Sequence, residues 1–189
     1  MGKKRQMLHP PRTFLALVCS APFLVTPVLA ADMAHLDLQS SAFAPNATIP
    51  MPYVCTDASG AGKSPPLNWH GAPASAKTLA LVVRDPDAPS GSFVHWVVYN
   101  LPGNTTKLAA DVPKTDAVAG GGEQGVNGFG NIGYLGPCPP PGKPHHYHFH
   151  LYALDSELNL KPSATADDVE QAAKGHTLAE ADLVGIFGR

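Results

Sequence analysis

The segment from Gly133 to Tyr152 constrains the fold more than any other part of the chain. Its first half is a glycine- and proline-rich loop that leads directly into the run opening at His145. Glycine lets backbone N–H groups approach a ligand closely, and proline holds a loop in one shape with little entropy left to lose. A rigid loop that ends in a strand predicts the wall of a small-molecule pocket rather than part of a core.

Three runs have the apolar, aromatic and β-branched composition of strands, namely 78–84, 93–100 and 147–154. The first is closed by the turn sequence Asp85-Pro-Asp-Ala-Pro89. The glycine-rich segment 119–130 is expected to be an irregular loop. Taken together, these patterns predict a mainly β protein.

One helix is predicted near the end of the chain. Thr165 can cap its start with Asp168 three residues later, and Gly175 can end it. The following segment, 177–187, fits a helix or a strand equally well on periodicity.

The first thirty residues have the pattern of a secretory signal peptide. Four basic residues precede an apolar run over 14–29, which ends in small residues at Ala30 and Ala31. The alternative is a retained membrane anchor, but the run is short for a membrane span and contains Pro22 and Pro27. We therefore expect an exported protein, periplasmic or secreted, with a signal peptide over 1–30, a lead-in over 31–42 and one domain over 43–189.

Loss of this leader changes the charge and the cysteine count. Removing its four basic residues takes the formal net charge from −2 to −6, which disfavours nucleic acid and anionic membranes as partners. Cys55 and Cys138 remain, an even number for an oxidising compartment, so a disulfide between them is predicted. Two buried free thiols are the alternative.

Polar residues gather around the predicted strand ends. Asp85 and Asp87 lie on a proline-stiffened turn, where a purely local role as hydrogen-bond acceptors is common. His95 follows in the next run and, by strand alternation, shares a face with Val97 and Tyr99. An aspartate beside His95 would hold its tautomer and raise its pKa.

The third strand run carries histidines on both faces. His145 and Tyr147 alternate with a row formed by His146, His148 and His150. Such a row resembles metal ligands, but a zinc site needs three or four convergent ligands with supporting partners. We expect no metal here; the row is predicted to be partly solvated or to pack against the helix.

These motifs resemble the phosphatidylethanolamine-binding protein family, in particular its bacterial Raf kinase inhibitor-like branch. The resemblance rests on Asp85-Pro-Asp-Ala-Pro89, His95-Trp96 in a strand ending Asn100-Leu-Pro102, and Gly133-Tyr-x-Gly-Pro137 leading to His145-x-Tyr147. It extends from about Phe43 to Arg189. It implies antiparallel β-sandwich-like sheets with a few peripheral helices.

The resemblance also implies a small anion pocket, and no cofactor or metal is expected in it. The matching ligand-binding positions are Asp85, Asp87, His95, Gly136, Pro137, His145 and Tyr147. His146 stands where the family most often has arginine, so a titratable group replaces a permanent cation at that point.

Several functions fit this pocket. Backbone N–H groups near Gly136 could bind phosphoryl oxygens, while Asp85 and Asp87 would repel a bare dianion. A protonated phosphate or a phosphoethanolamine-like group is therefore the expected ligand of an exported binding protein. An acid/base hydrolase is the alternative, although the chain has no Gly-x-Ser-x-Gly elbow and no other convincing nucleophile. A regulatory contact with a partner protein, or a homodimer, stays open.

Overall fold

The computed structural model describes residues 1–2, 35–57 and 60–189, so the predicted signal peptide lies almost wholly outside the described residues. The elements below belong to the unit Met33–Arg189. In chain order they are β1 (Asp37–Gln39), β2 (Ala47–Thr48), the 3-10 helix η1 (Met51–Tyr53), β3 (Leu67–His70), β4 (Thr78–Asp85), β5 (Phe93–Pro102), β6 (Lys107–Leu108), β7 (Glu123–Gln124), β8 (His145–Leu154), α1 (Ala166–Ala173) and β9 (Thr177–Phe187).

The strands form two sheets, which confirms the predicted mainly β fold. A three-stranded sheet has the order β1-β3-β6, and a six-stranded sheet has the order β2-β9-β8-β4-β5-β7. All neighbouring pairs are antiparallel except β2 and β9. The segment expected to be a lead-in contains β1, which pairs with β3.

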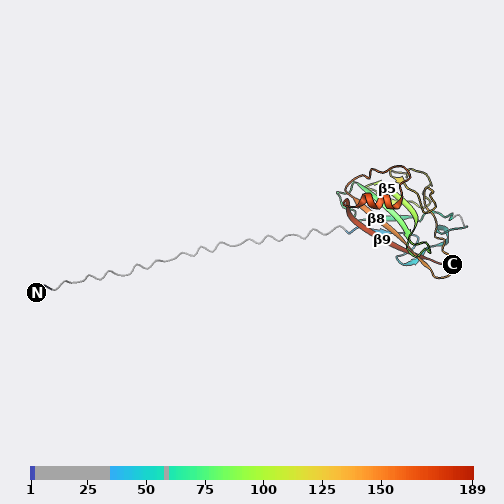
Figure 1. Cartoon of the computed structure of the whole chain (residues 1–189), viewed down its shortest axis with the longest axis horizontal. Coiled ribbons are helices and arrows are strands. Elements are labelled where there is room, and N and C mark those ends of the chain that lie inside the picture. Colours follow the sequence, from blue (N-terminus) through green and yellow to red (C-terminus); the bar gives the residue numbers. More distant parts are fainter. Residues whose placement is uncertain (3–34, 58–59) are drawn as a thin grey trace. The chain divides into compact units, whose positions relative to one another are not determined.

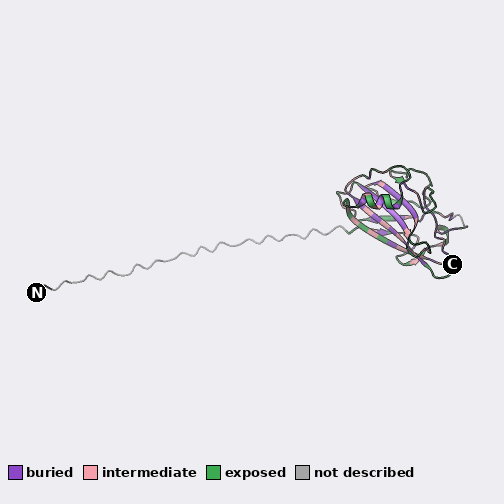
Figure 2. Ribbon diagram, viewed as in Figure 1, coloured by how far each residue is buried: buried purple, intermediate pink, exposed green. Residues whose placement is uncertain are grey.

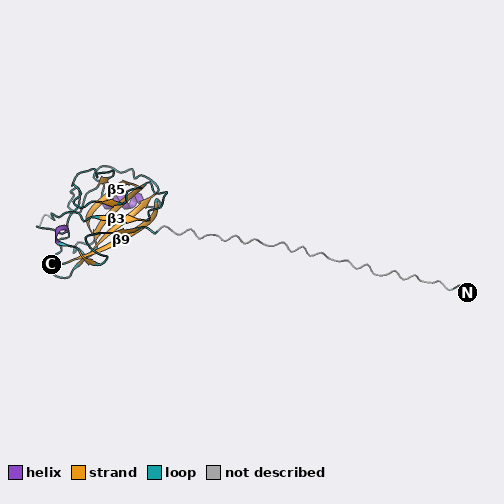
Figure 3. Cartoon of the chain, turned by 180° about the vertical axis from the view of Figure 1, so that it is seen from behind, coloured by secondary structure: helices purple, strands orange, loops and turns teal. Residues whose placement is uncertain are grey.

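Strand β4 lies at the centre of three layers. Leu79, Leu81 and Val83 face the core between the sheets, whereas Ala80 and Val82 pack under α1. The helix is in front of the six-stranded sheet in Figure 1 and behind it in the reverse view of Figure 3, where β3 is in front. Burial on both faces explains why β4 is a continuous apolar run rather than an alternating one.

Helix α1 begins with the predicted capping box. The Thr165 side chain accepts from the Asp168 backbone N–H, and the Asp168 carboxylate accepts from the Thr165 backbone N–H. Its buried side is apolar and its outer side is exposed (Figure 2). Arg84 of β4 joins the helix to the sheet by donating to Glu170 at 2.9–3.0 Å and to Asp167 at 2.6 Å.

The tertiary structure decides two segments that local patterns left open or misread. Residues 177–187 form β9, which pairs with β8 from His145↔Phe187 to Leu154↔Thr177. The glycine-rich segment was expected to be wholly irregular, and this is wrong over β7. Gln124 pairs with Val98 of β5, and its side chain accepts from the Trp96 indole at 2.7 Å.

The expected face of His95 is also wrong. Val83 pairs with Trp96 but Arg84 pairs with Val94, so the register shifts by one residue and His95 has no partner opposite on β4. Such an extra residue turns the strand locally. The His95 ring therefore packs against Tyr147, at 5.1 Å between ring centroids, and not with Val97 and Tyr99 under the helix.

The predicted disulfide is confirmed: Cys55 and Cys138 are bonded, with 5.3 Å between their Cα atoms.

Within the described residues, no helix is long and apolar enough to cross a membrane.

Candidate ligand-binding site

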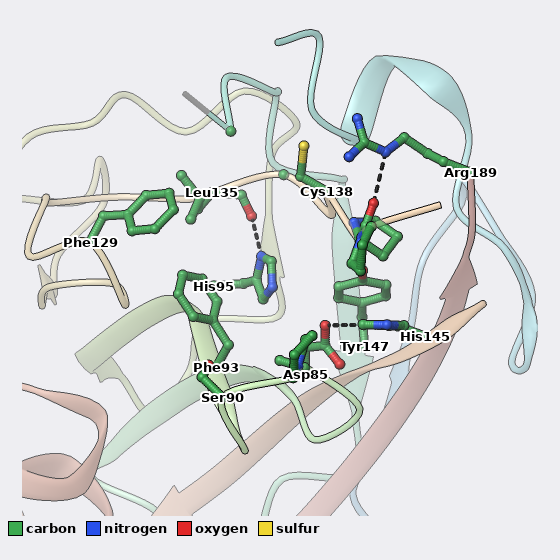
Figure 4. Close-up of a pocket in the computed structure, with 16 residues that line it drawn as sticks. Asp85, Ser90, Phe93, His95, Phe129, Leu135, Cys138, His145, Tyr147 and Arg189 are labelled. Carbon is green, nitrogen blue, oxygen red and sulfur yellow. Dashed lines mark hydrogen bonds and ion pairs between the residues drawn. The ribbon is translucent and has the colours of Figure 1, made fainter. Parts of the chain in front are cut away.

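A cavity of about 360 Å³ opens at one end of the six-stranded sheet, where β4, β5 and β8 meet the Gly133–Pro144 loop (Figure 4). Its polar lining residues include Asp85, Ser90, His95, His145, Tyr147 and Arg189. Phe93, Phe129 and Leu135 supply an apolar wall. The rings of Phe129, Phe93, His95 and Tyr147 follow one another in edge-to-face contacts of 5.1–5.2 Å.

Asp85 and His145 form a buried pair on the cavity wall. The His145 Nδ1 atom lies 2.8 Å from Asp85 Oδ2, and the two side chains are only 9% and 5% exposed. Because a carboxylate only accepts, this contact places a hydrogen on Nδ1 and leaves Nε2 without a partner in the described chain. Asp85 Oδ1 also accepts from the Asp87 backbone N–H at 2.9 Å, which braces the turn.

His95 is held by a different partner from the one expected. Its Nδ1 atom lies 2.8 Å from the Leu135 carbonyl oxygen rather than beside an aspartate. Burial lowers its pKa, and the Leu135 hydrogen bond and the nearby Asp85 charge oppose this only in part. His95 therefore stays neutral near pH 7, in contrast to the raised pKa that an adjacent aspartate would have caused.

Tyr147 presents an unpaired polar atom to the cavity. The side chain is 1% exposed, yet its hydroxyl has no hydrogen-bond partner of acceptable geometry in the described structure. Burial and the charge of Asp85 raise its pKa well above its usual range, so it stays a neutral donor. A buried polar group without a partner is uncommon and indicates a ligand or an ordered water.

Arg189 is a site residue that no motif pointed to. Its Nε atom donates to the Pro139 carbonyl at 2.8 Å, which holds the guanidinium at the rim above the loop (Figure 4). Its terminal Nη atoms have no partner in the described chain, and its positive charge partly opposes the rise in the pKa of Tyr147. Tertiary folding brings it there, because β9 pairs with the strand that opens at His145.

Two other predicted positions do not line the cavity. Asp87 accepts from the His146 backbone N–H at 2.9 Å and from its ring Nδ1 at 2.7 Å, and these bonds lower the pKa of Asp87. Asp87 therefore holds His146 on the outer side of the turn rather than facing the cavity. Pro137 directs its carbonyl to the Cys55 N–H at 3.0 Å.

Gly136 lines the cavity, but not as the expected anion nest. Its N–H donates to the Gly60 carbonyl at 2.9 Å and is therefore occupied. A Cβ atom here would lie 2.6 Å from the Val54 carbonyl carbon, so only glycine allows the two segments to approach. The Cys55–Cys138 bond joins the same two segments and stiffens this wall.

The comparisons with known proteins agree with this architecture. Residues 39–188 match the phosphatidylethanolamine-binding protein family, and the chain belongs to it. A protein of Methanothermobacter thermautotrophicus is 46% identical over 154 residues, covering 82% of this chain and 99% of its own length. A Mycobacterium tuberculosis protein named as a lipoprotein is 42% identical, covering 86% of this chain and 76% of its own.

Two solved structures have the same fold. Escherichia coli YbcL superposes with a TM-score of 0.75 at 30% identity, covering 82% of this chain and 99% of its own. A Chlamydia trachomatis homologue of phosphatidylethanolamine-binding protein gives a TM-score of 0.73 at 37% identity, with the same coverage.

Proposed function

We propose that the protein binds a small phosphorylated or similar anionic ligand in this cavity. One observation carries the proposal: the buried Tyr147 hydroxyl lacks a partner in a cavity whose rim carries the Arg189 guanidinium. A phosphoryl oxygen would pair with both, because a guanidinium and a hydroxyl are good donors to oxyanions. Family membership supports the same reading.

The location proposed for this function is outside the cytoplasm. A disulfide that spans 83 positions suits an oxidising compartment, and the lipoprotein name of the Mycobacterium tuberculosis relative points the same way. We propose export by the predicted signal peptide. A contact with a partner protein is compatible with this role, but no described surface favours one.

Hydrolysis is the second candidate, favoured by the Asp85–His145 pair. A carboxylate that orients an imidazole is a common arrangement for acid/base catalysis. However, Ser90 makes no hydrogen bond to either histidine in the described structure, so the cavity shows no activated nucleophile. Incubating the protein with phosphoethanolamine and assaying free phosphate tests this alternative.

Calorimetric titration with phosphoethanolamine tests the binding proposal. Tyr147→Phe and Arg189→Gln should each weaken binding by roughly tenfold or more, because each removes a donor to a charged group. Lys174→Gln is the matched control, since it removes an exposed cation from the end of α1 that does not line the cavity. Unchanged affinity in both cavity variants would overturn the proposal.

A further inference from the structure

The hydrogen-bonding roles of His95 are settled by its partner. The Leu135 carbonyl can only accept, so at 2.8 Å the His95 Nδ1 atom must carry a hydrogen. The ring is buried and its pKa is lowered, so only one nitrogen is protonated near pH 7. The other nitrogen, Nε2, is therefore an acceptor.

That acceptor is available inside the cavity. His95 Nε2 has no hydrogen bond in the described structure, and Figure 4 shows it on the side of the ring toward Tyr147 and Asp85. The opposite roles belong to the Tyr147 hydroxyl and the Arg189 Nη atoms, which can donate. The cavity thus offers donors for an anion together with one buried lone pair that needs a donor from the ligand.

A fully deprotonated oxyanion cannot meet this requirement. Sulfate would set an oxygen lone pair against Nε2, near the Asp85 carboxylate. Hydrogen phosphate has the same charge and shape, but its P–OH group can donate to Nε2. A phosphodiester, such as an intact phospholipid headgroup, has no P–OH hydrogen, so its phosphoryl group, like sulfate, cannot donate to Nε2.

We propose that the cavity selects oxyanions that carry a hydrogen, namely phosphate and protonated phosphate monoesters, over sulfate and phosphodiesters. The selection rests on the proposed function, since an anion must bind in the cavity before its hydrogen can bond to His95 Nε2. His95 determines the specificity, while Arg189 and Tyr147 hold the charge. The ligand class is accordingly inorganic phosphate, or a phosphate monoester at a pH low enough to keep one oxygen protonated, rather than an intact lipid.

Calorimetry at about pH 8 isolates the P–OH group, because phosphate is then mostly a dianion like sulfate. The three titrants are inorganic phosphate, sulfate and dimethyl phosphate, a phosphodiester that has no hydrogen-bond donor. We expect phosphate to bind about 10- to 100-fold more tightly than sulfate, the cost of leaving a buried acceptor unpaired. The diester should bind no better than sulfate.

His95→Asn provides the structural test. The Asn amide can still donate to Leu135 but has no lone pair at the Nε2 position, so phosphate and sulfate affinities should converge. His150→Asn, on the outer face of β8, is the matched control and should keep the wild-type ratio. If the His95 variant does not fold, the wild-type comparison of three anions still decides the question.

The outcomes separate this inference from the proposed function. Equal binding of phosphate and sulfate would overturn the selection and leave an anion-binding cavity. Tighter binding of the diester than of phosphate would also overturn it and would favour a lipid headgroup. If no titrant binds, the proposed function fails and the inference fails with it.

Discussion

Strand β8 places histidines on two faces of one sheet, and the two faces use them differently. His145 lies on the inner face, where its side chain is 9% exposed against Asp85. His148 and His150 lie on the outer face, with side chains 40% and 32% exposed. Both faces pair imidazole with carboxylate. The faces differ in how far these side chains are exposed to solvent and in whether nearby polar atoms lack hydrogen-bond partners.

On the outer face, the histidines already have carboxylate partners from strand β9. His148 Nδ1 lies 2.9 Å from Asp182, and His150 Nε2 lies 3.0 Å from Glu180. Among the residues that the structure describes, no group of three or more His, Cys, Asp or Glu is arranged to hold a metal. The inner face instead leaves the Tyr147 hydroxyl and His95 Nε2 without partners.

This difference teaches that histidine number alone does not identify a binding site. Unpaired polar atoms in a buried place carry a desolvation cost that a ligand or water can remove. Paired groups at a half-exposed place gain little more from a ligand. Four experiments, in descending order of expected effect, bear on the contrast between the two faces.

Removing the disulfide should have the largest effect, because it ties the inner-face cavity wall together. Replacing both Cys55 and Cys138 by Ser should lower the free energy of unfolding by about 2–5 kcal/mol, since the bond closes a long loop. Urea denaturation of the variant and the wild type measures this change. A loss below about 1 kcal/mol would show that the Gly136 contacts hold the wall without the bond.

Breaking the inner pair should come next. Asp85→Asn keeps the shape but removes the charge that the buried His145 contacts, so we expect a loss of about 1.5–3 kcal/mol in unfolding free energy. Stability equal to that of the wild type would contradict a structural role for this pair.

Asp182→Asn is the matched substitution on the outer face and should cost no more than about 1 kcal/mol, since solvent screens the pair. The Asp182 carboxylate, 3.7 Å from His150 Nδ1, raises the pKa of His150. The pKa of Asp182 is lowered: its partial burial opposes this shift, but its contacts with His150 and His148 outweigh the burial.

The pKa shifts of His150 and Asp182 define the pH range in which their ion pair stabilises the fold. The His150 part is fully present below its unfolded pKa of about 6.5 and is lost as pH rises through the higher folded value. The Asp182 part is present above about 3.9 and is lost as pH falls through the lower folded value. Urea denaturation should therefore find the largest difference between wild type and variant near pH 4–6.5. A difference that grows above pH 8 would contradict this assignment.

Chelation should have the smallest effect. If His146, His148 and His150 hold no required metal, protein prepared with EDTA should keep its melting temperature. Addition of zinc to the treated protein provides the control. A marked loss of stability that stoichiometric zinc restores would mean that the outer row is a metal site.

Local sequence patterns determined three of the long strands and the helix of this protein. The runs 78–84, 93–100 and 147–154 became β4, β5 and β8, and the Thr165–Asp168 box begins α1. These signals are short-range, because burial periodicity and helix capping depend on residues a few positions apart. The Cys55–Cys138 bond could be predicted by counting residues, because only two cysteines lie outside the predicted signal peptide.

Tertiary structure alone decided which polar groups meet. A one-residue register shift beside β4 turned His95 toward Tyr147, and the pairing of β9 with β8 carried Arg189 to the cavity. Asp85 bonds His145, 60 positions away, and Asp87 bonds the neighbouring His146, 59 positions away. Such partners depend on strand register and on the paths of the loops. Both are properties of the whole sheet, so the residues nearby in the chain do not predict which partners meet.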